Sequence, residues 1–214
     1  MNMNCIYNVS PNLKVVELRQ DPLMINITTI DEETAAEFRD AMSMAHNSGQ
    51  EVIPIIIDSY GGNVHSLLSM VDCIVESKRK VATIVIGKAL GCASILAAMG
   101  NKGLRFVSPN ASLMLNNVSK ESWGKTGDFK PDSREVERLY KLVCKMLDKN
   151  CDKEEGYFES LIKDKGGCDW YFEASDAVDY NLIDHIKLPW MEVNIQPEYQ
   201  FDNIKYKENV NEID

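Results

Sequence analysis

The hydrophobic residues of this chain fall into short continuous runs and longer helical repeats. Six short runs, each bounded by turn residues, predict β-strands, and the most apolar of them are typical of buried parallel strands. Pro54 interrupts one run, which is unusual because proline cannot donate a hydrogen bond to a neighbouring strand. The runs span residues 15–18, 23–27, 52–57, 81–86, 104–107 and 113–115.

Apolar residues at helical spacing separate these runs. Asp31 suits the N-cap of a helix that presents Ala35, Phe38, Met42 and Ala45 on one face. This alternation of strands and helices predicts an α/β fold with a largely parallel sheet. Further helices are expected over residues 67–75, 91–99, 133–150 and 158–162, with a short helix and a strand over 174–186.

Composition narrows the class of protein. The chain has 214 residues, a formal net charge of −10 and a pI of about 4.9. Its length fits one sizeable domain, and its acidity argues against nucleic acid or an anionic membrane as a partner. Scattered cysteines without a CxxC pair and only three histidines predict no metal or other cofactor. No secretory signal and no membrane-spanning apolar run is visible, so a cytoplasmic protein with reduced thiols is expected.

Two glycine-rich junctions carry the candidate chemistry. Asp58-Ser59-Tyr60-Gly61-Gly62 follows one apolar run, and Gly87-Lys88-Ala89-Leu90-Gly91-Cys92-Ala93-Ser94 follows the next. Each leads from a predicted strand into a predicted helix. Backbone amides at two such junctions are suited to an oxyanion hole, which stabilises the charged oxygen formed during acyl transfer. Together the two segments look like a serine-peptidase active site from which the serine is missing.

Four motifs in order resemble the proteolytic subunit of the Clp protease, within the Clp/crotonase superfamily. They begin with Ile57–Gly62 and Gly87–Cys92, continue from Phe106 through Pro109-Asn110 to Asn116, and end with the stretch from Asp169-Trp170-Tyr171 to Asp184. The resemblance extends from Pro22 to Ile186. It implies a Clp/crotonase-like fold of repeated β-β-α units with a protruding handle helix. Tyr60, Lys88 and the Asp-Trp-Tyr triplet resemble phage-encoded members more than the bacterial housekeeping enzyme.

The family's reaction needs a nucleophilic serine, a histidine that accepts its proton and an aspartate that orients the histidine. The resemblance places these three positions at Gly91, Asn116 and Asp169. Glycine has no nucleophile and the amide of asparagine is not a base, so only the aspartate is retained. The resemblance assigns the oxyanion-hole amides to Gly62 and Cys92. We therefore expect a peptidase fold that is catalytically inactive.

Nearby side chains offer alternatives. Ser94 lies about one helical turn after Gly91, where a buried serine commonly bonds to a helix carbonyl. Cys92 adjoins the nucleophile position at an expected helix N-terminus, where thiolates are favoured, yet its side chain points about 100° away on a helix. An active serine- or cysteine-type endopeptidase that uses either residue is thus one alternative. A crotonase-like acyl-CoA enzyme, which needs no serine, is another.

The three histidines have no assigned role in this comparison. His65 either faces the cleft or lies on the first turn of the helix after Gly62. His46 and His185 have no partner nearby in the sequence and are expected at the surface.

The family resemblance also implies partners. It implies self-association into rings, alone or with active Clp protease subunits, a possible AAA+ chaperone, and extended peptide bound by strand addition in the substrate groove. The amphipathic helix over residues 133–150 corresponds to the handle that joins two rings, although its apolar stripe would also suit the core. The expected divisions are an N-terminal segment (1–21), a Clp-protease-like domain (22–188, handle region about 117–165) and an acidic C-terminal tail (189–214).

Overall fold

The computed structural model describes residues 18–19, 23–116, 133–166, 169–190 and 194–195. Its main element is a seven-stranded sheet with the order β2-β3-β4-β5-β8, to which β6 is joined through β4 and β7 through β6. Every pair in this sheet is parallel except β6 with β7, so the predicted α/β fold with a largely parallel sheet is confirmed. The strands are β2 (Ile25–Ile27), β3 (Val52–Ser59), β4 (Lys80–Leu90), β5 (Arg105–Val107), β6 (Ser112–Leu115), β7 (Trp170–Phe172) and β8 (His185–Ile186). A separate pair joins β1 (Leu18–Arg19) to β9 (Asn194–Ile195).

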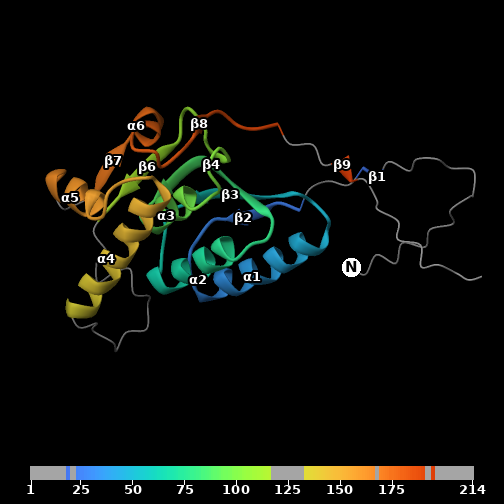
Figure 1. Cartoon of the computed structure of the whole chain (residues 1–214), viewed down its shortest axis with the longest axis horizontal. Helices are drawn as coiled ribbons and strands as arrows, with labels where there is room; N and C mark the ends of the chain where they lie inside the picture. The colour runs from blue at the N-terminus through green and yellow to red at the C-terminus, as the bar shows by residue number, and fades with distance from the viewer. Residues whose placement is uncertain (1–17, 20–22, 117–132, 167–168, 191–193, 196–214) are drawn as a thin grey trace, which may run out of the picture.

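Six helices lie in the described part of the chain. Figure 1 shows α1 and α2 together on one side of the sheet, where they pack on each other. Helix α3 contacts α2, β3 and β4, and α4 packs on α3 and α5. The helices are α1 (Glu32–Asn47), α2 (Val64–Val75), α3 (Cys92–Ala98), α4 (Ser133–Asn150), α5 (Tyr157–Asp164) and α6 (Ala174–Asp179).

The two faces of the sheet bury different amounts of apolar surface. Along β3, the alternate residues Ile53, Ile55 and Ile57 are fully buried in the main core with the helices. Ile56 points to the other face, because successive side chains alternate along a strand. There a small cluster forms from Ala82, Ile84 and Phe106, with Val52, Ile56 and Leu104 packed at its edge. This second face lacks a helical layer among the described elements.

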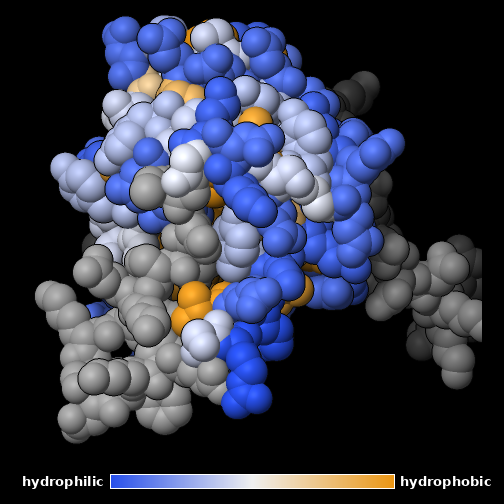
Figure 2. Space-filling model, turned by 90° about the vertical axis from the view of Figure 1, so that its left-hand side faces the viewer, coloured by the Kyte–Doolittle hydropathy of each residue, from blue (hydrophilic) through white to orange (hydrophobic). Residues whose placement is uncertain are grey.

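The amphipathic pattern of α4 is used for the core. Leu139, Val143 and Leu147 are buried in the main cluster. The opposite side is charged, and the predicted pair of Glu137 with Lys141 forms at 2.7 Å. Figure 2, which views the molecule from the α4 side, shows a mainly hydrophilic surface with a few hydrophobic patches. The structure therefore supports the core interpretation of the stripe; a ring–ring contact stays a prediction.

Two details differ from the sequence pattern. Helical spacing predicts Val75 within the apolar stripe of α2, but Val75 is the last residue of that helix and is 67% exposed. The extended segment Trp170–Phe172 was not predicted as a strand, and it pairs antiparallel with β6. Pro54 does lie within β3, at a position where only β4 is paired, because pairing with β2 begins at Ile55.

Several expectations fall on residues outside those described. They concern most of the strand over 15–18, the part of the handle region over 117–132 and the tail beyond residue 195. No helix within the described ranges is long and apolar enough to cross a membrane.

Helix α1 begins with the predicted cap. One Asp31 carboxylate oxygen accepts a hydrogen bond from the Thr34 amide at 2.9 Å, and the Thr34 hydroxyl accepts one from the Asp31 amide at 2.9 Å, which forms a capping box. The four residues predicted for its apolar face, Ala35, Phe38, Met42 and Ala45, are the ones buried.

We expect Asp31→Ala to lower the free energy of unfolding by about 1 kcal/mol, because it leaves orphan amides at the start of α1. Asp31→Asn is the matched control, since asparagine is an equally good cap. The hydrogen bond from the Thr34 amide lowers the pKa of Asp31, so this carboxylate stabilises the fold above its unfolded pKa of about 3.9, and that stabilisation disappears as pH falls through the lowered value. Urea unfolding at pH 7 and at pH 3 measures both effects: a loss for Asp31→Ala that is as large at pH 3 as at pH 7 would contradict the cap.

Candidate active site

The candidate site forms where β3 and β4 end side by side. Their register is regular up to Ile57 opposite Val85, and then Ser59 lies opposite Ala89, so β4 contains two extra residues. This irregularity includes Gly87, whose φ of +80° favours glycine. A β-carbon on Gly87 would lie 3.0 Å from Oδ1 of Asp58. The bulge carries β4 on to Leu90, beyond the end predicted from the apolar run.

Gly91 forms a sharp turn between β4 and α3. Its φ of 55° and ψ of −119° lie in a region that residues with a side chain rarely adopt. The Gly91 amide donates to the Met114 carbonyl at 3.0 Å, and the Gly91 carbonyl accepts from the Ile95 amide at 3.3 Å. Strained strand-to-helix turns of this kind hold the serine of α/β-hydrolases.

The Gly91 turn faces Asn116. A β-carbon placed on Gly91 would lie 3.4 Å from Oδ1 of Asn116. Asn116 directly follows β6, and β6 runs beside the end of β4 with Leu90 opposite Met114. The two positions that the family resemblance assigns to nucleophile and base are therefore in side-chain contact distance, although they are far apart in the sequence.

Asp169 lies next to Asn116 across the pair of strands β6 and β7. Strands β6 and β7 pair with Leu115 opposite Trp170, so the same register places Asn116 opposite Asp169. Asp169 is exposed, and no hydrogen bond joins it to Asn116 in the described structure. Asp169 thus lies opposite Asn116, just before the neighbouring strand, but no hydrogen bond from Asp169 orients the Asn116 side chain in the described structure.

The second turn, Gly61-Gly62, packs tightly against its neighbours. The Ile30 amide donates to the Gly61 carbonyl at 3.1 Å, and the Asn63 amide donates to the Ile30 carbonyl at 2.7 Å. A β-carbon on Gly62 would lie 2.1 Å from that Ile30 carbonyl oxygen, far inside contact distance. Only glycine fits here.

The two predicted oxyanion-hole residues contact each other. Cys92 Sγ donates a hydrogen bond to the Gly62 carbonyl at 3.3 Å. The pairing with Ile30 uses the Gly61 carbonyl and the Asn63 amide, so the Gly62 amide is not consumed by it. Cys92 is the first residue of α3, a position whose amide has no acceptor within its own helix. Both amides therefore lie at adjacent turns, as an oxyanion hole requires.

Ser94 has a structural environment. Its hydroxyl is buried, donates to the Ala89 carbonyl, and accepts from the Met114 amide at 3.3 Å. The acceptor is a strand carbonyl five residues earlier, and not the helix carbonyl that a serine at this place was expected to use. These contacts join β4, α3 and β6 beneath the Gly91 turn.

Cys92 does not have the environment of a nucleophile. Burial raises the pKa of its thiol to about 12, and interactions with the backbone of Gly62 and of Cys92 itself are smaller, opposing effects. A thiolate is therefore scarce near neutral pH. The expectation that a helix N-terminus would favour the thiolate is outweighed here by loss of solvent around the sulfur.

The histidines lie away from Gly91. His65 is exposed on the first turn of α2, as one of its two interpretations predicted. His46 and His185 were expected at the surface. Both are half-buried, and each makes at least one hydrogen bond with a neighbouring group. His46 contacts the Met42 carbonyl at 2.8 Å and Ser77 Oγ at 3.1 Å, while the ring of His185 stacks on Phe106 with centroids 5.0 Å apart.

A cluster that sequence reasoning missed lies beside the two turns. Lys88 Nζ contacts Asp58 Oδ1 at 2.7 Å and lies 4.3 Å from the ring centroid of Tyr60, which is 77% exposed. The hydrogen bond to Asp58 raises the pKa of Lys88, so its amine stays protonated. Lys88 is thus a paired cation beside the two turns. No local pattern predicts this ion pair, because Asp58 and Lys88 lie on separate strands, β3 and β4.

A model of the Clp protease family matches residues 13–188. The chain belongs to the Clp protease family. Among curated proteins, ATP-dependent Clp protease proteolytic subunit 2 of Frankia casuarinae is 32% identical over 135 residues, which cover 63% of this chain and 60% of that protein. The ATP-dependent Clp protease proteolytic subunit of Dehalococcoides mccartyi is 32% identical over 134 residues, covering 63% of this chain and 65% of that protein.

Two consequences follow for this member of the Clp protease family. The resemblance drawn from four motifs is confirmed, and the Clp/crotonase-like fold with it. The chain spans less than two thirds of the length of the curated relatives it matches.

Proposed function

We propose that this chain is a Clp-protease-fold subunit that no longer hydrolyses peptides and retains the scaffold of the site. The observation that carries the proposal is the short separation between the Gly91 position and Oδ1 of Asn116. The two turns and the strand register bring the Gly91 and Asn116 positions together, and the family resemblance assigns to them the nucleophile and the base, for which glycine and asparagine have no suitable group.

The environments of the two substitute nucleophiles support the same proposal. Ser94 donates to one backbone carbonyl and accepts from one backbone amide, and its hydroxyl is out of contact with solvent. Cys92 is a neutral thiol bonded to a backbone carbonyl. No hydrogen bond joins either residue to the side chain of a base in the part of the chain that the structure describes, so acyl transfer would lack its first proton acceptor there. The family match favours the peptidase branch of the superfamily over a crotonase-like acyl-CoA enzyme.

We further propose that the subunit assembles into rings, alone or with active Clp protease subunits, and works beside an AAA+ chaperone. The match to the Clp protease family, whose curated relatives are named as ATP-dependent Clp protease proteolytic subunits, supports this part of the proposal. Extended peptide is proposed to bind by strand addition near the Gly61-Gly62 turn. Such a subunit would hold or admit peptide without cleaving it.

The test is a peptidase assay with short fluorogenic peptides on purified protein. We expect the turnover of the wild-type chain to equal that of a control treated with a serine-hydrolase inhibitor. Wild-type turnover well above that control, together with labelling of Ser94 by a fluorophosphonate probe or of Cys92 by iodoacetamide, would overturn the proposal of inactivity.

A double revertant tests whether the scaffold of the site is intact. We expect Gly91→Ser with Asn116→His to gain peptidase activity and fluorophosphonate labelling at residue 91, because the two side chains are brought together beside the oxyanion-type amides. The matched control is Gly91→Ala with Asn116→His, which has the same backbone conformation but no hydroxyl. Activity in both variants, or in neither while assembly is unchanged, would show that the site has diverged beyond these two residues.

A further inference from the structure

A second concave surface shares no lining residue with the Gly91 and Gly61-Gly62 turns. It is a cavity of about 1060 Å³ between the C-terminal halves of α2 and α4 and the turn that follows α3, and we call it the α2–α4 groove. Lys80 at its edge begins β4, whereas Gly91 follows the other end of that eleven-residue strand. An extended strand of this length separates the two by roughly 30 Å. The groove is therefore not part of the candidate active site.

The floor of the groove is apolar and partly uncovered. Val75 is 67% exposed and Leu142 is 36% exposed, although both lie on helices whose other apolar residues are largely buried. Exposed aliphatic residues gathered in a concavity mark an interaction site more often than isolated ones do. The apolar lining residues include Leu68, Val71, Val75, Leu104, Leu142 and Met146.

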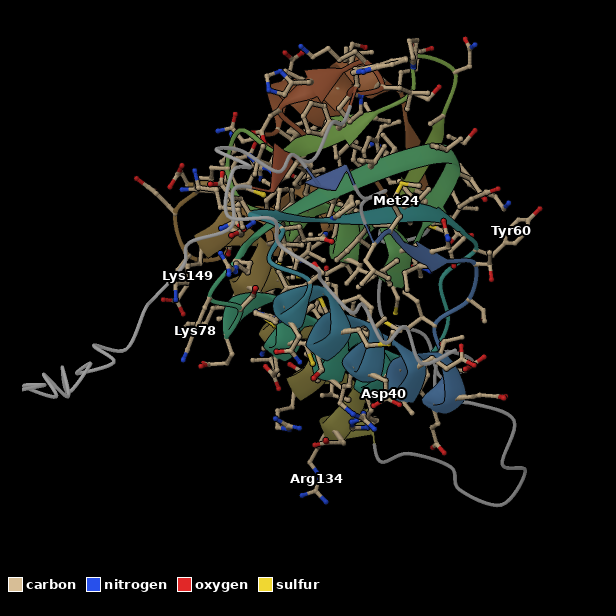
Figure 3. All side chains as sticks on the ribbon, turned by 90° about the vertical axis from the view of Figure 1, so that its right-hand side faces the viewer. Met24, Asp40, Tyr60, Lys78, Arg134 and Lys149 are labelled. Atoms are coloured by element: carbon tan, nitrogen blue, oxygen red, sulfur yellow. The ribbon has the colours of Figure 1, made fainter. Side chains whose placement is uncertain are left out.

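The rim of the groove is cationic in a protein of net charge −10. Lys80, Lys102 and Lys149 line it, against one acidic lining residue, Asp72. Lys102 pairs with Asp152 at 2.5 Å, while Lys80 and Lys149 form no ion pair with any residue in the described ranges. The neighbouring Lys78 extends from the same edge as Lys149 (Figure 3). The local charge is thus opposite to that of the chain as a whole.

The size and composition of the groove favour a peptide segment over a small molecule. Its volume is at the upper limit of the roughly 300–1,000 Å³ range of small-ligand pockets, so one small ligand would leave apolar floor in contact with water. Grooves between two helices commonly take the apolar face of an amphipathic helix. Lysines at the rim would then attract acidic residues on the flanks of that helix.

We propose that the α2–α4 groove binds an acidic amphipathic helical segment of a partner protein. Apolar side chains of the segment cover Val75 and Leu142, and its carboxylates approach Lys80 and Lys149. This interaction goes beyond the proposed function, because it needs neither the Gly91 turn nor a bound substrate.

The experiment measures binding of a defined probe by fluorescence anisotropy. The probe is a fluorescein-labelled peptide of two Leu-Glu-Glu-Leu-Leu-Glu-Glu repeats, which places leucine on one helical face and glutamate on the other. We expect saturable binding to the full chain that weakens as salt rises. Lys80→Glu with Lys149→Glu should weaken it by about tenfold or more, and Val75→Asp should weaken it as strongly.

Two controls separate the groove from the rest of the surface. Lys163→Glu makes, at an exposed site on α5, the same charge change as each one of the two lysine substitutions, and it should leave binding unchanged. A peptide with lysine in place of glutamate should not bind more weakly to the variant with Lys80→Glu and Lys149→Glu than to the wild type. Because Lys80 and Lys149 are exposed, the double variant keeps the fold, which a melting curve verifies.

Three outcomes would overturn the proposal. They are absence of saturable binding, equal binding by the groove variants and by Lys163→Glu, and self-association of the wild type that Val75→Asp abolishes while the peptide does not compete. The last would assign the groove to a second copy of this chain. None of them bears on peptidase activity, so failure here is distinguishable from failure of the proposed function.

Discussion

Replacement of Gly62 by alanine is expected to lower the free energy of unfolding by about 4 kcal/mol, or to prevent folding altogether. The added β-carbon would lie 2.1 Å from the Ile30 carbonyl oxygen and 2.9 Å from its carbon. Two backbone hydrogen bonds hold Ile30 against this turn, so the clash cannot be relieved without losing them. The φ of +150° at Gly62 adds strain for any residue with a side chain.

Gly49→Ala is the matched control for this prediction. Gly49 also has a positive φ, +83°, but a β-carbon there would meet nothing within 4 Å. It should therefore lose only the conformational strain, about 1 kcal/mol. Soluble yield and urea unfolding compare the two variants. Equal losses would mean that the close approach of Ile30 to Gly62 does not exist in solution.

Removal of the Asp184 carboxylate is expected to cause the second large loss of folding stability. Asp184 Oδ1 accepts from Arg105 Nη2 at 2.6 Å, and Oδ2 accepts from Arg105 Nε at 3.0 Å and from the Gly103 amide at 2.8 Å. The guanidinium of Arg105 is almost fully buried. Asp184→Ala leaves that charge without its partner, and such losses are about 3–5 kcal/mol for buried pairs.

The effect of Asp184 depends on pH with a definite sign. Burial alone would raise the pKa of Asp184, but the hydrogen bonds and charge of Arg105 outweigh burial and lower it. The carboxylate therefore stabilises the fold above its unfolded pKa of about 3.9, and this stabilisation is lost as pH falls through the lower folded value. The difference between wild type and Asp184→Ala should be full at pH 7 and should shrink at pH 3.

Asp152→Ala is the control for the Asp184 prediction. Asp152 also contacts a cation, Lys102 at 2.5 Å, but both side chains are largely exposed. An exposed pair contributes about 1 kcal/mol or less. Thermal unfolding of both variants at pH 7 and pH 3 gives the comparison. If Asp184→Ala loses no more stability than Asp152→Ala, the Arg105–Asp184 ion pair does not act as a buried contact between β5 and the segment before β8.

Local signals explain what the sequence predicted well. Asp31 and the spacing of Ala35, Phe38, Met42 and Ala45 depend on residues within one helix, and all were confirmed. Helix α4 was predicted with its observed bounds for the same reason. The predicted facing of Gly91 and Asn116 needed the family resemblance, because no local pattern connects two residues on separate strands.

Features that depend on distant contacts were missed. The strand Trp170–Phe172 is defined by pairing with β6, which lies more than fifty residues earlier in the sequence. A run of three residues is too short to show the alternation that predicts a strand. The bulge at Gly87 extends β4 through residues that looked like a turn. For Cys92, the helix N-terminus supported only the alternative of a reactive thiolate, and burial by the surrounding chain, which no local pattern shows, raises its pKa.

On the proposed assignment of Gly91 to the nucleophile position, the backbone there makes loss of a serine easier than its recovery. At a φ of 55°, glycine is unstrained, while serine would hold about 1–3 kcal/mol of strain at the same turn. In a lineage that no longer needed hydrolysis, selection for stability alone would favour glycine at this position. A return to serine would require stability gained elsewhere first, so the turn acts as a one-way step in the history of the fold.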